Sequence, residues 1–196
     1  MDPALDAAQP FRILVVCTGN VCRSPLAERW LQHRFDTLAP GRTRVASAGT
    51  RALVGEPVAG PIAAIGLAEG ITFDGFAARQ LEPQSIRAAD LVLTAGREHL
   101  AEVLRAEPAA LKRTFLIREL ARVLGDASFG AERRGAAEWR PAWKQAIARA
   151  SAFRRAPSRD DEVTDPFRRG PAAYEAMASQ LLPALDALQG YGERLV

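Results

Sequence analysis

Residues 11–25 read FRILVVCTGNVCRSP, and this stretch decides the fold. Its first part, Phe11–Cys17, is a short run rich in β-branched residues, which is typical of a strand buried on both faces of a parallel sheet. A turn sequence, TGN, ends the run. Ser24 and Pro25 then predict the start of a helix, with Ser24 as its capping residue.

The same alternation recurs along the chain. Further strands are predicted at Thr43–Ser47, Ala89–Thr94 and Arg113–Ile117, and further helices at Pro57–Leu67, Arg97–Arg105 and Arg118–Leu124. Strands that alternate with helices indicate an α/β fold with a parallel sheet and right-handed crossovers.

The segment from Gly125 to Glu162 breaks this rhythm. Trp139 and Trp143 begin an apolar stripe at helical spacing, which predicts a helix over about Ala136–Arg155. We favour core packing for this stripe, with a lid or a docking surface as the alternatives. A last helix is predicted over Pro171–Leu188.

Length and composition are those of one globular domain. The chain has 196 residues, of which 48% are hydrophobic and 25% charged. We therefore expect an N-terminal tail at residues 1–10 and a single domain at 11–196, with a helical insertion at about 125–162.

The residue counts also exclude several classes of protein. A net charge of +3 is too small to indicate a nucleic-acid partner. Two cysteines and two histidines argue against a disulfide scaffold and a zinc module, so we expect no metal and no cofactor. An acidic start and short apolar runs predict a cytoplasmic protein with no membrane insertion.

Chemistry is concentrated in the loop after the first strand. Backbone N–H groups at a helix N-terminus bind anions, and Gly19 allows the backbone to approach an anion closely. Arg23 is placed to clamp an oxyanion through two parallel hydrogen bonds. The same positive field favours the nucleophilic thiolate of Cys17, and Ser24 can donate a hydrogen bond to it. These groups predict phosphoryl transfer without a metal.

Such a reaction also needs a proton donor for the leaving oxygen. Asp165, followed by Pro166 in a polar loop before the last helix, is the candidate. For His33 and His99, on helix-like segments, surface or capping roles are favoured over catalysis.

The segment VVCTGNVCRSPLAE, residues 15–28, resembles the signature of low-molecular-weight protein tyrosine phosphatases almost residue for residue. Ser47–Thr50, Ala89–Thr94 and Asp165-Pro166 resemble three further family segments in the same order. The resemblance implies a three-layer sandwich, in which helices flank a four-stranded parallel sheet and the phosphate-binding loop follows the first strand.

The resemblance also implies the roles of the site residues. Cys17 would attack phosphorus and form a phosphocysteine, while Asp165 would first protonate the leaving oxygen and then activate water. Arg23 and the loop would hold the transferring group, Asn20 would brace the loop, and Ser24 would assist departure of the thiolate. The phosphate-binding loop comprises Thr18, Gly19, Asn20, Val21, Cys22, Arg23 and Ser24.

The sequence departs from the family pattern around the substrate pocket. Leu53 and Val54 stand where the family usually carries an aromatic residue, and Phe167 follows Asp-Pro where tyrosines are frequent. We expect these three residues in the pocket. Cys22 is interpreted either as a packed loop residue or as the partner of oxidised Cys17 in a reversible disulfide.

The expected substrate is a phosphotyrosine protein, and the expected state is a monomer or weak dimer. A phosphoarginine phosphatase on the same scaffold is the closest alternative. In related enzymes a bulky aliphatic residue at the position of Val21 suits phosphotyrosine and a threonine suits phosphoarginine; Val21 is aliphatic but threonine-sized, which favours phosphotyrosine. An arsenate reductase is disfavoured by the count of two cysteines. A non-catalytic phosphate-binding module is disfavoured by the presence of a nucleophile, a clamp and an acid together.

Overall fold

The computed structural model describes residues 9–126, 129–154, 156 and 158–196, so the expected tail lies almost entirely outside the described residues. The strands are β1 (Phe11–Cys17), β2 (Thr43–Gly49), β3 (Leu91–Thr94) and β4 (Thr114–Leu116). The α-helices are α2 (Arg23–Leu38), α3 (Gly60–Ala68), α4 (Pro83–Ala88), α5 (Arg97–Ala106), α6 (Ile117–Gly125), α7 (Trp139–Ala152) and α8 (Pro171–Glu193). Three short 3₁₀ helices are η1 (Pro108–Arg113), η2 (Ala136–Glu138) and η3 (Arg159–Asp161).

The four strands form a parallel sheet in the order β2-β1-β3-β4. The central strand β1 ends with Cys17 paired to Gly49 of β2, and Val16 is paired to Thr94 of β3. Every residue of β1 except Arg12 is buried, as expected for a strand covered on both faces. The predicted fold class is confirmed.

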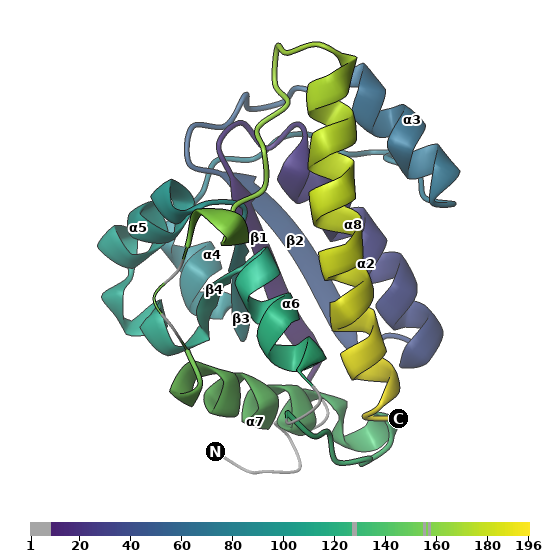
Figure 1. Ribbon diagram of the computed structural model, residues 1–196, viewed down its shortest axis with the longest axis vertical. Helices are drawn as coiled ribbons and strands as arrows, with labels where there is room; N and C mark the ends of the chain where they lie inside the picture. The colour runs from purple at the N-terminus through teal and green to yellow at the C-terminus, as the bar shows by residue number, and fades with distance from the viewer. Residues whose placement is uncertain (1–8, 127–128, 155, 157) are drawn as a thin grey trace.

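Helices cover both faces of the sheet and give three layers (Figure 1). Side chains of β1 alternate between the two covers, since neighbouring residues of a strand point to opposite faces. Ile13 and Val15 belong to a core shared with α2, α6 and α8. Leu14 and Val16 belong to a smaller core shared with α4 and α5.

Helix α7 lies across the amino ends of the strands, at the opposite end of β1 from Cys17 (Figure 1). Trp139 and Trp143 are each 1% exposed. The Trp143 ring stacks on Phe11 at 5.5 Å between centroids, and Trp139 Nε1 donates to Thr43 Oγ1 at 2.8 Å. The expectation of core packing is confirmed, and the alternative that this helix is a lid is wrong.

Several predicted boundaries differ from the structure. Helix α2 begins at Arg23 with Cys22 in the capping position, so Ser24 is not the cap; its hydroxyl is instead engaged with side chains of the loop. The short helix α4 was not apparent as a periodic pattern, because only Ile86 of its residues is buried. The helix predicted over 136–155 divides into η2 and α7, and Phe153, expected on the apolar stripe, is 65% exposed.

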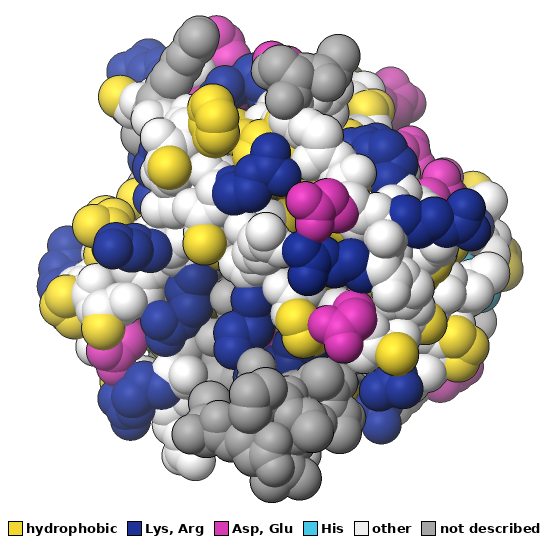
Figure 2. Space-filling model, turned by 90° about the horizontal axis from the view of Figure 1, so that it is seen from below, with side chains coloured by type: hydrophobic (Ala, Val, Ile, Leu, Met, Phe, Trp, Pro, Cys, Tyr) yellow, Lys and Arg dark blue, Asp and Glu magenta, His cyan; other side chains and the backbone are white. Residues whose placement is uncertain are grey.

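The molecular face at the α7 end carries more basic than acidic side chains (Figure 2). The chain has only two lysines, Lys112 and Lys144, and both line one pocket of about 700 Å³ between η1 and α7. Within the ranges described above, no helix is long and apolar enough to cross a membrane.

Candidate active site

The site begins where β1 ends and α2 starts. Cys17 is the last residue of β1, and Arg23 is the first of α2. Asn20, in the loop between them, has a φ of 56°, a left-handed conformation that asparagine adopts more readily than most residues. This turn directs the loop back over the N-terminus of α2, whose N–H groups and dipole favour an anion.

The end of β2 closes tightly against this loop. The amide of Thr50 donates to the Cys17 carbonyl at 2.9 Å, and the amide of Arg51 donates to the Thr18 carbonyl at 3.0 Å. A Cβ atom at Gly49 would lie 2.4 Å from the Thr18 carbonyl oxygen. Only glycine fits between strand and loop at this point.

Asn20 braces the loop from inside, as the resemblance implied. Its side-chain amide donates to Ser24 Oγ at 2.9 Å and Ser47 Oγ at 2.7 Å, and its Oδ1 accepts from the Arg79 amide at 2.7 Å. Ser47 Oγ in turn donates to Glu28 Oε2 at 2.5 Å, and Arg79 Nη2 donates to the same oxygen at 2.8 Å. The left-handed turn is therefore held by satisfied buried polar groups.

Ser24 connects this network to the thiol. Its Oγ lies 2.9 Å from Cys17 Sγ. Because the Asn20 amide already donates to Ser24 Oγ, the hydroxyl hydrogen of Ser24 is free to point at the sulfur. This arrangement suits a hydrogen bond that stabilises a thiolate.

Arg23 is buried, with 5% of its side chain exposed, beside the thiol. Its guanidinium lies 2.9 Å from Asp165 Oδ2 through Nη2, and it donates to the Val163 carbonyl and to Thr18 Oγ1 at 3.3 Å each. Its Nε is buried and has no hydrogen-bond partner among the residues that the structure describes. The guanidinium thus keeps donor capacity for an oxyanion.

Cys17, Arg23 and Asp165 line one pocket of about 100 Å³. The other lining residues are Thr18, Gly19, Val21, Cys22, Arg51, Leu53 and Phe167. Leu53 and Phe167 thus lie where the sequence predicted, whereas Val54 is 69% exposed and is not part of the lining. The pocket combines a charged floor with an apolar rim.

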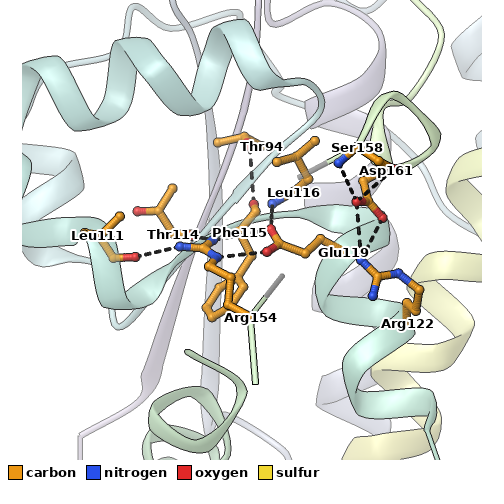
Figure 3. A network of polar contacts seen from close by, with 10 residues as sticks. All are labelled: Thr94, Leu111, Thr114, Phe115, Leu116, Glu119, Arg122, Arg154, Ser158 and Asp161. Atoms are coloured by element: carbon orange, nitrogen blue, oxygen red, sulfur yellow. Dashed lines mark hydrogen bonds and ion pairs between the residues drawn. The ribbon is translucent and has the colours of Figure 1, made fainter. Parts of the chain in front are cut away.

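The segment that leads to Asp165 is anchored by ion pairs whose carboxylates, on Glu119 and Asp161, are buried (Figure 3). Glu119 accepts from the Leu116 amide at 3.1 Å and from Arg154 Nε at 2.8 Å, so the chain leaving α7 is tied to the start of α6. Asp161 accepts from the Ser158 amide at 3.0 Å and pairs with Arg122 of α6 at 3.2 Å.

Backbone contacts then fix the last residues before Asp165. The Val163 amide donates to the Ala95 carbonyl at 2.8 Å, just beyond β3. The Thr164 amide donates to Gln180 Oε1 of α8 at 2.7 Å. Asp165 itself accepts from the Phe167 amide at 3.1 Å and is 40% exposed, so its carboxyl faces both the pocket and solvent.

Cys22 is a free, buried cysteine in the lining of the pocket. Burial, with smaller contributions from Cys17 and Asp165, raises the pKa of its thiol to about 12. The resting Cys22 thiol is therefore protonated at neutral pH, and its redox role stays a prediction.

Sequence reasoning missed the position of His99. The surface or capping role favoured for it is wrong, because its side chain is 1% exposed and its Nε2 lies 2.8 Å from Thr18 Oγ1. A signal was available: His99 lies in the first turn of α5, directly after β3, and the carboxyl ends of parallel strands converge on one site. His33 is exposed, as expected.

The described residues contain no cluster of three or more His, Cys, Asp or Glu side chains able to hold a metal ion. The groups that line the pocket are instead a thiol, a guanidinium and a carboxyl group.

Comparison with known proteins gives one consistent result. Residues 12–127 match the family model described as low molecular weight phosphotyrosine protein phosphatase. The phosphatase Etp of Escherichia coli K12 is 40% identical over 104 residues, which cover 53% of this chain and 67% of Etp. The phosphatase Wzb of Salmonella typhi is 31% identical over 186 residues, which cover 91% of this chain and 97% of Wzb.

Solved structures show the same fold. The tyrosine phosphatase AmsI of Erwinia amylovora shares 25% identity, with a TM-score of 0.64 over 92% of this chain and 91% of AmsI. The YwlE arginine phosphatase of Geobacillus stearothermophilus shares 24% identity, with a TM-score of 0.66 over 92% of each chain.

Proposed function

This chain belongs to the low-molecular-weight protein-tyrosine phosphatase family, and from that premise we propose that it hydrolyses phosphotyrosine in proteins through a phosphocysteine on Cys17. The observation that carries the proposal is that Cys17, Arg23 and Asp165 line one small pocket. A nucleophile, an oxyanion clamp and a proton donor are the three groups that metal-free phosphate-ester hydrolysis requires.

The reaction takes two steps. In the first, Cys17 Sγ attacks phosphorus, the S–P bond forms and the bond from phosphorus to the tyrosyl oxygen breaks. Asp165 gives its proton to that oxygen, and Arg23 with the loop amides holds the three other phosphoryl oxygens. In the second, Asp165 takes a proton from water, the water oxygen bonds to phosphorus, and the Cys17 thiolate leaves. Ser24 stabilises the departing thiolate through its hydrogen bond.

The test is hydrolysis of p-nitrophenyl phosphate in the presence of EDTA. Cys17→Ser and Arg23→Ala are each expected to lower kcat/KM by roughly 10³-fold or more, because the nucleophile and the charge clamp act together in the transition state. Arg12→Ala, at the single exposed position of β1, is the matched control and is expected to be fully active. Full activity of Cys17→Ser, or loss of wild-type activity in EDTA, contradicts the proposal.

Asp165 is tested by changing the leaving group. Asp165→Asn is expected to lower kcat by about 10²-fold on phenyl phosphate and by less on p-nitrophenyl phosphate, whose leaving group needs little protonation. Equal losses on both substrates would remove Asp165 from the role of general acid.

Substrate choice is settled by matched peptides carrying phosphotyrosine or phosphoarginine. We propose that the phosphotyrosine peptide has the higher kcat/KM, since Val21 is aliphatic and the pocket rim is formed by the apolar side chains of Leu53 and Phe167. A higher kcat/KM for the phosphoarginine peptide would assign the alternative activity.

We further propose that Cys22 protects the nucleophile. Peroxide oxidises the Cys17 thiolate to a sulfenic acid, and the Cys22 sulfur then displaces water to form a disulfide. Wild type treated with peroxide is expected to recover activity in dithiothreitol, whereas Cys22→Ser loses it irreversibly. Equal, irreversible loss in both proteins would leave Cys22 as a packed loop residue.

A further inference from the structure

His99 is the buried titratable group that the proposed mechanism leaves without a task. It lies in the first turn of α5, and its side chain is 1% exposed. Its Nε2 contacts two groups: Thr18 Oγ1 at 2.8 Å and Glu98 Oε1 at 3.3 Å. The Glu98 side chain is 69% exposed and therefore solvated, so the contact with Thr18 is the buried one.

Thr18 connects this ring to the catalytic guanidinium. The Thr18 hydroxyl oxygen accepts from Arg23 Nη2 at 3.3 Å, and the same hydroxyl group hydrogen-bonds to His99 Nε2 at 2.8 Å, with the tautomer of the ring setting which of the two donates. A chain of two hydrogen bonds therefore runs from α5, through the first residue of the loop, to Arg23.

The ring is a neutral support. Burial, and to a lesser extent the positive charge of Arg23, lowers the pKa of His99 to about 4. The Val163 carbonyl that holds the other end of the guanidinium is also neutral. Arg23 also pairs with the Asp165 carboxylate at 2.9 Å. The two neutral contacts add fixed positions for the guanidinium without competing with a phosphate for its charge, as the carboxylate does.

We propose that His99 is a positioning residue of the phosphate site: it holds the Thr18 hydroxyl, and through it holds Arg23 facing the bound oxyanion. The proposal rests on the proposed function, because the guanidinium it positions is the phosphoryl clamp. His99 itself touches no substrate in this role.

A double-mutant cycle on Thr18 and His99 tests the proposal. Two quantities are measured: the calorimetric Kd for sodium tungstate, a tetrahedral oxyanion, and kcat/KM for p-nitrophenyl phosphate. Thr18→Val and His99→Leu are each expected to weaken tungstate binding roughly tenfold, the scale of one hydrogen bond. The double variant is also expected to lose roughly tenfold, because both substitutions break the same connection.

Conservative variants distinguish positioning from packing. Thr18→Ser keeps the hydroxyl and His99→Gln keeps a neutral hydrogen-bonding end, so both are expected to bind tungstate within about threefold of wild type. Val103→Ala is the matched control: Val103 is buried on α5, and its truncation is expected to lower Tm while leaving the tungstate Kd unchanged.

Two results overturn the proposal. One is a loss of roughly a hundredfold in the double variant, which would mean independent effects. The other is a tungstate Kd for Thr18→Val equal to that of wild type. This second result would rule out the positioning role even if His99→Leu does not fold. Failure of the proposed function would look different, because the wild-type protein would then bind tungstate but hydrolyse no aryl phosphate. The tungstate Kd values of the four proteins in the double-mutant cycle would still test the positioning role of His99.

Discussion

The two ends of β1 are buried to the same degree but built from different chemistry. At its carboxyl end, Cys17 and the loop after it are surrounded by polar side chains that hydrogen-bond to one another. At its amino end, Phe11 stacks on Trp143, whose indole Nε1 has no partner within the described part of the chain. The difference separates two tasks, since directional hydrogen bonds fix the geometry of a site and apolar burial supplies stability.

The largest expected effect is at the amino end. Trp143→Ala removes a fully buried ring and is expected to lower the free energy of unfolding by about 4 kcal/mol. Because α7 lies at the far end of β1, kcat and KM of the folded variant should equal those of wild type. Urea unfolding and steady-state kinetics measure the stability and the kinetic constants, with Phe153→Ala, at the exposed residue directly after the same helix, as the control. A tenfold fall in kcat would show that the two ends are coupled.

The next effect is a pH dependence at the carboxyl end. The folded pKa of His99, about 4, lies below its ordinary value of 6.5, so the unfolded chain binds a proton between these values that the native protein does not. His99 therefore makes its full contribution above pH 6.5, and stability falls by about 3 kcal/mol as pH drops towards 4. The charged groups that act on the ring are Arg23, Asp165, Glu162 and Arg51, and Glu98 Oε1 lies 3.3 Å from its Nε2.

Unfolding measured from pH 7 to 4 in wild type and His99→Gln isolates this contribution. The variant lacks the titrating ring, so its stability should fall less steeply over that window. Parallel curves for the two proteins would mean that His99 is not buried in its neutral form.

The smallest effect concerns the pocket rim. Phe167→Ala removes an apolar wall and is expected to raise KM for aryl phosphates about fivefold, with kcat little changed. Val54→Ala is the matched control, because Val54 is exposed outside the pocket lining. Equal KM values in the two variants would remove Phe167 from substrate binding.

The same division explains what the sequence could predict. The loop could be predicted because the proposed nucleophile, oxyanion clamp and thiolate donor lie within the eight residues Cys17–Ser24, where spacing alone fixes their relative placement. The position of His99 after β3 could have placed it near the site, but its contact with Thr18 joins residues 81 positions apart, so the sequence could not identify that partner. The placement of α7 at the amino ends of the strands likewise depends on tertiary packing, which periodicity does not encode. Asp165 lies between these cases, since its loop was predicted but the network that anchors it was not.

Gly49 carries a consequence for mutational scanning. Its backbone leaves room for a hydrogen atom alone, with the Thr18 carbonyl oxygen 2.4 Å from where a Cβ would lie. A library covering every position would report this glycine as intolerant of all nineteen replacements, as it would report Cys17. The two failures would differ in kind: a Cys17 variant folds and retains an empty site, whereas a Gly49 variant displaces the loop itself. Activity scores alone would classify both residues as catalytic. Only a parallel measurement of protein abundance or oxyanion binding would separate the residue that shapes the loop, Gly49, from the proposed nucleophile, Cys17.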